Sequence, residues 1–314
     1  MNIITQDQLK NLTGGMAIDG IVLIKDYSVQ LTRNGKEYIA GRLQSGIDKP
    51  FKAWGSSAAF NSLKNEAYEN VPTYIRGSGD EYGGTISLIL DSVQAVDGYT
   101  PDQFFPVKYN ADAYWEALKK LVSTRVSAKA LNICNKILFE NQTVSDRFKV
   151  EFAGRSHHDN CKSGLLAHTY KVTSTVASVI QQYPAITSRD GVTEQNLVDL
   201  LLVGALLHDV GKIYELEFGV YQPVSCVTHK YLGSELIAEY KAEIIAAYDE
   251  LWYYHLISIM LEHHGQYGEP PKTVWAQIIH IVDMFDSQLT DMMQAIDSTN
   301  GQGAIKFDTN YLSL

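Results

Sequence analysis

Cysteine is scarce in this sequence and is not arranged for disulfides or a zinc knuckle. Its three cysteines, Cys134, Cys161 and Cys226, are odd in number, widely spaced and free of any Cys-x-x-Cys pair. Disulfide scaffolds and structural zinc sites need such pairs, so we expect reduced thiols, as in the cytoplasm. Cys226 stands three residues before His229, but this is a weak zinc signal because buried structural thiols are commoner.

Long apolar runs and a secretory leader are also missing. The most apolar segment, residues 200–207, is bounded by Asp199 and His208. It is far shorter than the roughly 20 residues that a membrane-spanning helix needs. The first residues show no basic segment followed by an apolar one, so no secretory signal is expected. The sequence therefore predicts a cytoplasmic protein without a membrane partner.

Positive charge is in deficit. The formal net charge is -10, and residues 1–105 carry nine Lys and Arg against twelve Asp and Glu. Proteins that bind nucleic acid through a broad positive surface show the opposite balance. Any nucleic-acid site must therefore be local, and must rely on aromatic side chains and metal ions more than on bulk charge.

The 314 residues are enough for two domains, and the first part has the period of strands. Short runs rich in Val, Ile, Tyr and Thr predict strands at 20–30, 37–44, 50–54, 72–77 and 84–95, with a helix at 57–68. Asn34-Gly35 predicts a hairpin turn after the first strand, and 77–80 predicts another before the last. Five strands with a helix between the third and fourth is the order of an OB-fold. We expect an all-β OB-fold barrel over residues 1–105.

The period changes to about 3.6 after the break at Thr100-Pro101, which predicts helices. The expected helices are 111–123, 128–140, 163–183, 193–208, 229–248, 251–264 and 273–296. The sequence contains no internal repeat. Residues 106–314 are therefore expected to form an all-α bundle, with its core at 155–298.

The adjacent pair His208-Asp209, at the end of the apolar helical run, is the strongest chemical signal. Neither side chain is easily buried without a partner, which indicates a bound cation. Further ligand-type residues lie in or beside other predicted helices: His168, His229, His263, His264 and Asp283. Helices of one bundle can bring such residues to a single core site. Seven ligands exceed what one ion needs, and Asp209 could bridge two.

Imidazole and carboxylate without thiolate suit Mn, Fe, Co, Ni or Zn in a hydrolytic site. Two ions roughly 3.5–4 Å apart can activate water and stabilise both oxygens of a phosphoryl transfer. Phosphoester hydrolysis is therefore the natural reaction, with Asp209 at its centre. Lys212, three residues after the pair, is near enough to bind a phosphate and to stabilise the transition state.

These residues resemble the H…HD…D pattern of the HD-domain metal-dependent phosphohydrolases, and the extra histidines resemble the dinuclear subset. A barrel followed by this helical domain is similar to the YhaM family of 3′-5′ exoribonucleases. The local matches are 164–168, 207–212, 262–265 and 279–286. The resemblance implies removal of nucleotides, supported by Mn or Co, from the 3′ end of single-stranded RNA, with DNA as an alternative substrate. It also places a histidine pair, His157-His158, in a loop where it could contact substrate.

Several assignments stay open at this point. His168 could be a core histidine, Lys212 could be a solvated lysine, and one of His263 and His264 could contact phosphate or solvent. Asp286 competes with Asp283 one helical turn away, and the family motif favours Asp283. His280 lies on the same helix face, where support of the site or core packing is favoured.

The barrel supplies candidate contacts for single-stranded nucleic acid. Stacking faces could come from Tyr38, Phe51, Trp54, Tyr74 and Tyr82, and phosphate contacts from Arg42, Lys52 and Arg76. Aromatic residues that alternate along strands are also typical of a barrel core. The acidic loop at 79–82 departs from what a strong RNA binder displays.

Two other functions compete with the exonuclease. One is an HD phosphohydrolase of nucleotides or cyclic nucleotides, which the acidic balance favours somewhat. The other is a catalytically silent OB-fold adaptor that binds nucleic acid, against which the complete set of seven ligands argues. The native metal and homo-oligomer formation are left open by the sequence.

Overall fold

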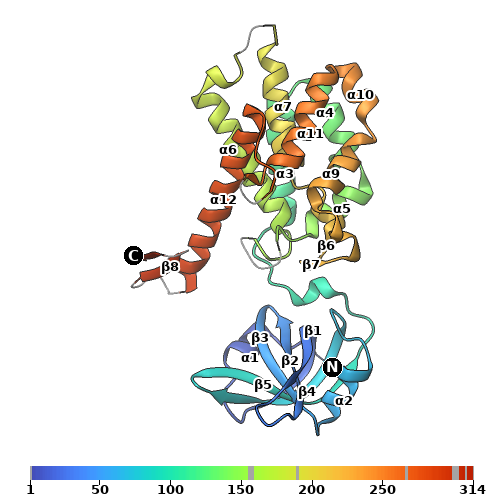
Figure 1. Cartoon of the computed structure of the whole chain (residues 1–314), viewed down its shortest axis with the longest axis vertical. Helices are drawn as coiled ribbons and strands as arrows, with labels where there is room; N and C mark the ends of the chain where they lie inside the picture. Colours follow the sequence, from blue (N-terminus) through green and yellow to red (C-terminus); the bar gives the residue numbers. More distant parts are fainter. Residues whose placement is uncertain are drawn as a thin grey trace. The chain divides into compact units, whose positions relative to one another are not determined.

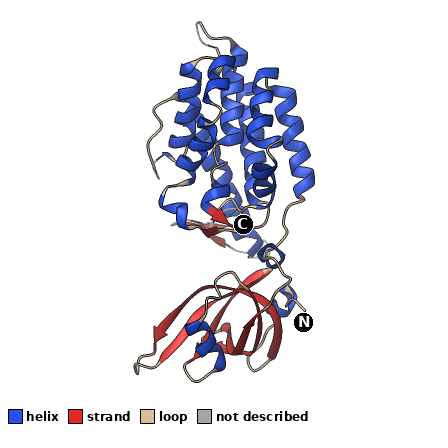
Figure 2. Ribbon diagram, turned by 90° about the vertical axis from the view of Figure 1, so that its right-hand side faces the viewer, coloured by secondary structure: helices blue, strands red, loops and turns tan. Residues whose placement is uncertain are grey.

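The computed structural model describes residues 2–154, 159–188, 191–265, 268–298, 304–307 and 310–313. The chain divides into two units, Met1–Val107 and Lys108–Leu314 (Figure 1). Figure 2 shows that the long strands belong to the first unit and nearly all the helices to the second. Among the described helices, none combines the length and the apolar character needed to cross a membrane.

The first unit is a closed barrel with the strand order β1-β2-β3-β5-β4. Its strands are β1 (Ala17–Leu31), β2 (Glu37–Ser45), β3 (Ile47–Trp54), β4 (Pro72–Tyr82) and β5 (Thr85–Ala95). Helix α1 (Gln6–Lys10) precedes the barrel, α2 (Ala58–Asn65) connects β3 to β4, and the 3-10 helix η1 (Pro101–Phe104) follows β5. Strands β3 and β5 pair in parallel, and the other four strand pairs of the barrel are antiparallel. Five strands in this order confirm the predicted OB-fold.

The hairpin turn that joins β4 to β5 differs from the prediction. Residues 77–80 continue β4, and the turn lies at Gly83-Gly84, where both residues have positive φ, 59° and 76°. Gly77 and Gly79 serve close packing instead, because an added Cβ would lie 2.2 Å from Ile89 O and 2.1 Å from Thr13 O. Glycine in a strand marks either a bend or a close approach of backbones, and the sequence alone does not separate the two.

The second unit is a helical bundle built around α7, as the sequence predicts. Its principal helices are α3 (Ala111–Arg125), α4 (Ala128–Cys134), α5 (Gln142–Val150), α6 (Gly164–Gln182), α7 (Glu194–Leu207), α9 (His229–Ala238), α10 (Lys241–Ala247), α11 (Glu250–Glu262) and α12 (Val274–Ser298). Helix α7 packs against α6, α11 and α12, and nearly all of its residues from Leu197 onward are buried. A helix that is apolar around its whole circumference is typical of such a buried, central position.

Shorter elements complete the bundle. They are the π-helix η2 (Asn135–Phe139), η3 (Pro184–Ile186), α8 (Lys212–Glu215), η4 (Pro223–Cys226), and the hairpins β6 (Leu216–Glu217) with β7 (Val220–Tyr221) and β8 (Ala304–Phe307) with β9 (Asn310–Ser313). The two hairpins and α5 are absent from the sequence prediction. Its single helix over 229–248 is wrong, because Tyr240 interrupts it and donates its hydroxyl to Lys136 O.

The start of α7 is tied to its neighbours by a buried carboxylate. Asp199 accepts hydrogen bonds from Ser127 N at 2.8 Å, Gln195 Nε2 at 2.9 Å and Tyr248 Oη at 2.6 Å. A buried carboxylate is tolerated when its oxygens are satisfied in this way. These bonds set the position of α7, whose opposite end carries the His-Asp pair.

Two of the three cysteines belong to the helical core. Cys134 and Cys161 are buried, whereas Cys226 is exposed at the end of η4. Burial raises the pKa of Cys134 to about 12 and that of Cys161 to about 11. Both thiols are therefore protonated at neutral pH and shielded from reagents.

We predict that a thiol reagent at about pH 8 modifies one cysteine per native chain and all three after denaturation, because only the thiolate reacts. The measurement is labelling followed by intact mass. Cys226→Ser should remove the native reactivity altogether. Rapid labelling of two or more thiols in the native chain would contradict the burial of Cys134 and Cys161.

Candidate metal centre

The His-Asp pair lies in a tight turn directly after α7. His208 and Asp209 are both buried, and α8 begins three residues later at Lys212. Gly211 permits α9 to approach this turn, because an added Cβ would lie 2.0 Å from His229 O. A larger residue at position 211 would push α9 away. The turn therefore brings His229, the first residue of α9, next to Asp209.

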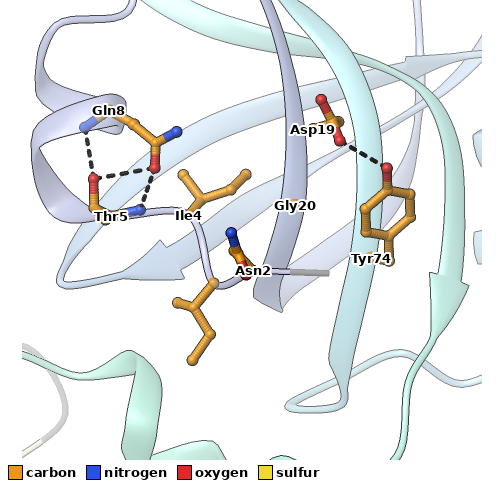
Figure 3. A pocket seen from close by; sticks show the side chains of 8 residues that line it. Asn2, Ile4, Thr5, Gln8, Asp19, Gly20 and Tyr74 are labelled. Carbon is orange, nitrogen blue, oxygen red and sulfur yellow. Dashed lines mark hydrogen bonds between the residues drawn. The ribbon is translucent and has the colours of Figure 1, made fainter.

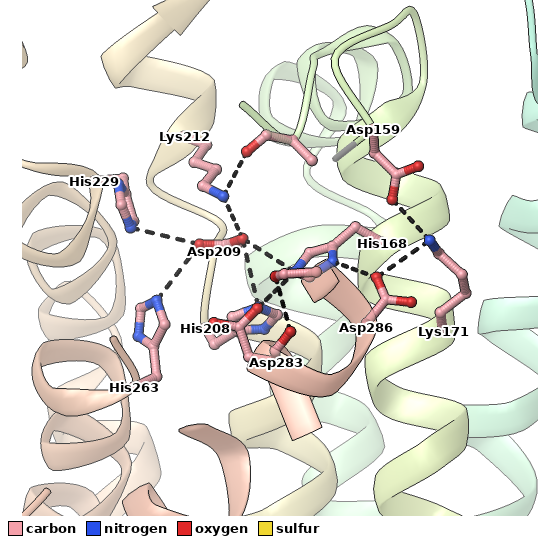
Figure 4. Close-up of polar contacts among 12 residues, drawn as sticks. Asp159, His168, Lys171, His208, Asp209, Lys212, His229, His263, Asp283 and Asp286 are labelled. Atoms are coloured by element: carbon pink, nitrogen blue, oxygen red, sulfur yellow. Dashed lines mark hydrogen bonds and ion pairs between the residues drawn. The ribbon is translucent and has the colours of Figure 1, made fainter. Parts of the chain in front are cut away.

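The Asp209 carboxylate faces histidines on two sides (Figure 4). Its Oδ2 lies 3.4 Å from Nε2 of His168 and 3.4 Å from Nε2 of His208. Its Oδ1 lies 3.5 Å from Nε2 of His229 and 3.5 Å from Nε2 of His263. Helices α6, α7, α9 and α11 each contribute one of these histidines, within the helix or directly after its end.

Two further predicted ligands lie at the edges of these groups. Asp283, on α12, places its Oδ1 3.2 Å from His168 Nε2. His264 Nε2 lies 3.3 Å from His229 Nε2. The fold thus brings together all seven residues that the sequence selects, in two groups that share Asp209. Within the set His168, His208, Asp209, and within the set Asp209, His229, His263, His264, the ligand atoms lie within 4.8 Å of one another.

Four of the histidines are oriented by a hydrogen bond at Nδ1. The acceptors are Asp286 Oδ2 for His168 (2.8 Å), Ala205 O for His208 (2.8 Å), Glu215 Oε2 for His229 (2.6 Å) and Met260 O for His263 (2.9 Å). When Nδ1 donates to such an acceptor, Nε2 presents its lone pair to the centre of the site. Histidines that bind metals in proteins are held in this manner.

The chemistry of the donor atoms fits divalent cations. Asp209 Oδ1 and His263 Nε2 are buried and have no hydrogen-bond partner among the described residues. Nε2 of His168 and Nε2 of His208 face each other at 3.2 Å. Buried acceptors without partners cost free energy. A cation in each of the two groups would be coordinated by these atoms.

Several charged groups surround Asp209. Burial by itself would raise the pKa of Asp209, but Lys212 and His208 hold it well below its usual range. Burial would lower the pKa of His168, yet Asp209, Asp283 and Asp286 raise it well above the usual value. Three carboxylates around one imidazole indicate an excess of negative charge, which a bound cation would neutralise.

His263 and His264, on the other side of Asp209, are held neutral. Burial lowers the pKa of His263. Burial, together with repulsion from His263 and His229, lowers the pKa of His264 to about 2. Neutral imidazole is the form that binds metals, so these side chains need lose no proton at neutral pH to act as ligands.

The structure also separates residues that the sequence leaves in competition. Asp283 faces Nε2 of His168, whereas Asp286 faces its Nδ1 and therefore orients the ring. Lys212 Nζ lies 2.6 Å from Asp209 Oδ2 and donates to Ala153 O at 2.5 Å, so its nearest partners are protein oxygens. His280 Nδ1 bonds His263 O at 2.7 Å and supports the turn after α11.

Some predicted residues lie outside the described part of the chain, and some supporting residues escape prediction. His157 and His158 fall outside the described residues. The sequence prediction misses the orienting roles of Glu215 and Asp286, together with Lys171 and Asp159 beside Asp286. Glu215 lies three residues after Lys212, at the opposite end of the short helix α8, and this spacing is a signal that could have marked it.

The barrel candidates fall on two different faces. Arg42, Lys52 and Trp54 lie on paired strands β2 and β3, where Tyr38 and Trp54 have ring centroids 5.2 Å apart. Tyr74 and Arg76 lie on β4, which pairs with β1 and β5. Phe51 is buried in the barrel core, so the expectation that it offers a stacking face is wrong.

A cavity of about 390 Å³ lies beside β1 and β4 (Figure 3). Asp19 and Tyr74 line one side, with the tyrosine hydroxyl donating to the carboxylate at 2.8 Å. The capping residues Thr5 and Gln8 of α1 line the other. Among the described residues, no lysine, arginine or histidine lines this cavity, so these walls do not suit a phosphate.

Comparison with known proteins finds a family model for the helical unit and relatives along most of the chain. The family model "HD domain" matches residues 165–288. The 3′-5′ exoribonuclease YhaM of Shouchella clausii is 27% identical over 304 residues, covering 90% of this chain and 87% of that protein. YhaM of Listeria monocytogenes is 25% identical over 310 residues, covering 94% and 92%. YhaM of Bacillus subtilis is 26% identical over 303 residues, covering 90% and 88%.

Among solved structures, the mitochondrial single-stranded DNA binding protein Rim1 of S. cerevisiae is similar to a part of the chain. It is 13% identical, with a TM-score of 0.24, and the match covers 27% of this chain and 96% of that one. A TM-score this low supports no conclusion about function.

The charge pattern of the centre predicts a pH dependence of stability in the metal-free protein. Burial opposes ionisation of Asp286, but His168 and Lys171 lower its pKa. Its stabilisation is therefore present above the unfolded pKa of about 3.9 and is lost as pH falls through the lower folded value. With a chelator present, Asp286→Asn should be less stable than the unmodified chain at neutral pH, and the gap should shrink below about pH 4.

Denaturant unfolding at a series of pH values measures this gap. Asp146→Asn, which changes an exposed carboxylate on α5, is the matched control and should show no gap at any pH. A difference in the free energy of unfolding between Asp286→Asn and the unmodified chain that grows in acid would contradict the predicted direction of the pH effect.

Proposed function

We propose that this protein is a metal-dependent 3′-5′ exoribonuclease. The premise is that the chain matches the HD-domain model and is similar to the YhaM 3′-5′ exoribonucleases over about nine-tenths of its length. Its substrate is single-stranded RNA, with single-stranded DNA as a second candidate. Its reaction is hydrolysis of the terminal phosphodiester bond. The OB-fold barrel holds the RNA while the 3′ end of the RNA reaches the metal centre in the helical unit.

The observation that carries this proposal is the placement of the Asp209 carboxylate. Its two oxygens face separate histidine groups, His168 with His208 and His229 with His263, at 3.4–3.5 Å. A carboxylate shared in this way suits a pair of divalent ions. His264 and Asp283 complete the two ligand sets. Mn²⁺ is the favoured metal, with Co, Fe, Ni and Zn as alternatives.

When bound, two divalent ions supply an activated water and neutralise charge on the attacked phosphate. The protein contributes position and charge. Lys212 keeps Asp209 ionised from 2.6 Å and adds a positive charge close to the phosphate site. Glu215 and Asp286 hold the rings of His229 and His168, which keeps their Nε2 atoms directed at the ions.

Binding of the RNA is assigned to the outer face of β2 and β3. OB-folds bind oligonucleotides on this face, where aromatic rings stack on bases. Here Trp54 is exposed, Tyr38 lies beside it, and Lys52 Nζ lies 5.8 Å from the Trp54 ring. Arg42 is paired with Asp48 at 3.0 Å, which reduces its attraction for phosphate. Few cations are thus available, and stacking carries more of the binding.

The activity is tested with single-stranded RNA labelled at its 5′ end, incubated with Mn²⁺. We expect a ladder that shortens from the unlabelled 3′ end. Asp209→Asn removes the shared ligand and should lower kcat/KM by about a thousandfold or more, since metal ions supply several kcal/mol of transition-state stabilisation. Asp146→Asn, on the surface of α5, is the matched control and should retain full activity.

Other outcomes separate the competing functions. Hydrolysis of mononucleotides or cyclic nucleotides, without shortening of any oligonucleotide, would replace the exonuclease by a small-molecule phosphohydrolase. Binding of RNA without hydrolysis of either class, in protein shown to hold metal, would indicate an adaptor. In a second assay the RNA carries its label at the 3′ end. Loss of that 3′ end while the 5′ end stays intact would be the strongest support for the proposal.

The proposed RNA face is tested by Trp54→Ala. Loss of one stacked base costs about 1–3 kcal/mol, so Kd for single-stranded RNA should rise by about fivefold or more. KM should rise with little change in kcat, because the ring lies outside the reacting centre. Fluorescence anisotropy with a labelled oligonucleotide measures Kd.

Tyr74→Ala is the comparison variant within the same barrel. Its hydroxyl is bonded to Asp19, whose negative charge disfavours a nearby phosphate, so we expect Kd within about twofold of the unmodified chain. A larger effect from Tyr74→Ala than from Trp54→Ala would move the interface from β2 and β3 to β4.

A further inference from the structure

A third group of ligand-type atoms lies beside the proposed centre. Asp159, His168 and Asp286 each offer one atom, and these atoms lie within 4.8 Å of one another. A cation already serves this group, because Lys171 Nζ lies 2.8 Å from Asp159 Oδ2 and 3.1 Å from Asp286 Oδ2. The ammonium of Lys171 therefore takes the place that a third metal ion would otherwise fill.

The contacts form a chain that ends on a proposed metal ligand (Figure 4). Lys171 Nζ donates to Asp286, and the same oxygen, Oδ2, accepts from His168 Nδ1 at 2.8 Å. At the other end, the hydroxyl of Tyr109 donates to Asp159 Oδ1. Lys171 also donates to Thr290 Oγ1 at 2.8 Å, on α12. Lys171 is thus held from three sides while it fixes the oxygen that orients His168.

We propose that Lys171 is a positioning residue for the metal centre. Acting through Asp286, it sets the ring of His168, and its charge keeps Asp159 and Asp286 from recruiting a further cation. This inference rests on the proposed two-ion site. Without the ammonium, two carboxylates would lie close together with no counter-charge, and Asp286 would lose the contact that directs its oxygen to His168.

The backbone fixes Asp159 rigidly enough to serve as the anchor. Asp159 is fully buried and has a positive φ of 53°. Its carbonyl accepts from Cys161 N at 2.8 Å. Gly164 approaches the same carbonyl so closely that an added Cβ would lie 1.9 Å from it. Because its backbone is confined in this way, Asp159 cannot move together with a displaced Lys171 side chain. The fold therefore determines the position of the Lys171 ammonium.

The arrangement affects only one side of Asp209. His168 faces Asp209 Oδ2, whereas His229 and His263 face Oδ1 and are oriented by Glu215 and a backbone carbonyl. Removal of the Lys171 charge should therefore lower the affinity for one ion and leave the affinity for the other unchanged. A general structural defect would weaken both.

The experiment titrates Mn²⁺ into Lys171→Met by calorimetry, with electron paramagnetic resonance to detect the coupled ion pair. Loss of an orienting partner lowers metal affinity by about 10–100-fold, so we expect one of two affinities to fall by this factor, and the other to stay within about twofold. The spin-coupled signal should be lost at Mn²⁺ levels that saturate the unmodified chain. Lys171→Arg keeps the charge and should recover most of the lost affinity.

Lys119→Met, which changes a partly exposed lysine on α3, is the matched control and should leave both affinities unchanged. Tyr109→Phe removes one hydroxyl from the same chain of contacts. It should shift the same single affinity by a smaller factor, and it provides the test if Lys171→Met fails to fold.

Equal loss of both affinities, or no loss in either variant, would overturn the inference. So would binding of fewer than two ions by the unmodified chain. Failure of the proposed function has a different signature, namely two bound Mn²⁺ ions with no shortening of RNA, and in that case the role of Lys171 at the ions stands.

Discussion

The helical unit depends on the placement of one buried carboxylate, Asp209, next to its apolar core. A buried anion is strongly unfavourable unless positive charge surrounds it. Lys212 supplies one such charge, and the two histidine groups offer sites for more. The apolar run of α7 and the close approach permitted by Gly211 are what deliver Asp209 to the position where all these groups meet.

Around this centre each outer carboxylate has its own compensation. Asp286 is matched by Lys171, and Glu215 binds His229. The excess negative charge is thereby confined to the space between the histidines, where cations would be held most strongly. Divalent ions held there would, together with Lys212, attract a phosphate of the proposed RNA substrate locally, so a chain of net charge -10 would need no broad basic surface.

Most of the architecture follows from patterns along the chain. Strand and helix periods, the Asn34-Gly35 turn and the apolar run before His208 predict an OB-fold barrel followed by a bundle, and the structure agrees. The errors have a common cause. Gly77 and Gly79 look like turn residues but allow close packing of backbones, and Phe51 looks like a stacking residue but fills the core. In both cases a neighbour distant in sequence determines the role of the residue.

The sequence by itself determined the kind of chemistry, because His-Asp with five further imidazoles and carboxylates on amphipathic helices has few other uses in a core. Only the tertiary structure decided how these residues divide, with Asp209 between two groups and Asp286 behind His168 rather than beside Asp283. The same is true of Lys171. The physical reason is that ligand type is a property of single residues, whereas distance, burial and the orientation of an imidazole are set by helices packing across more than a hundred residues of chain.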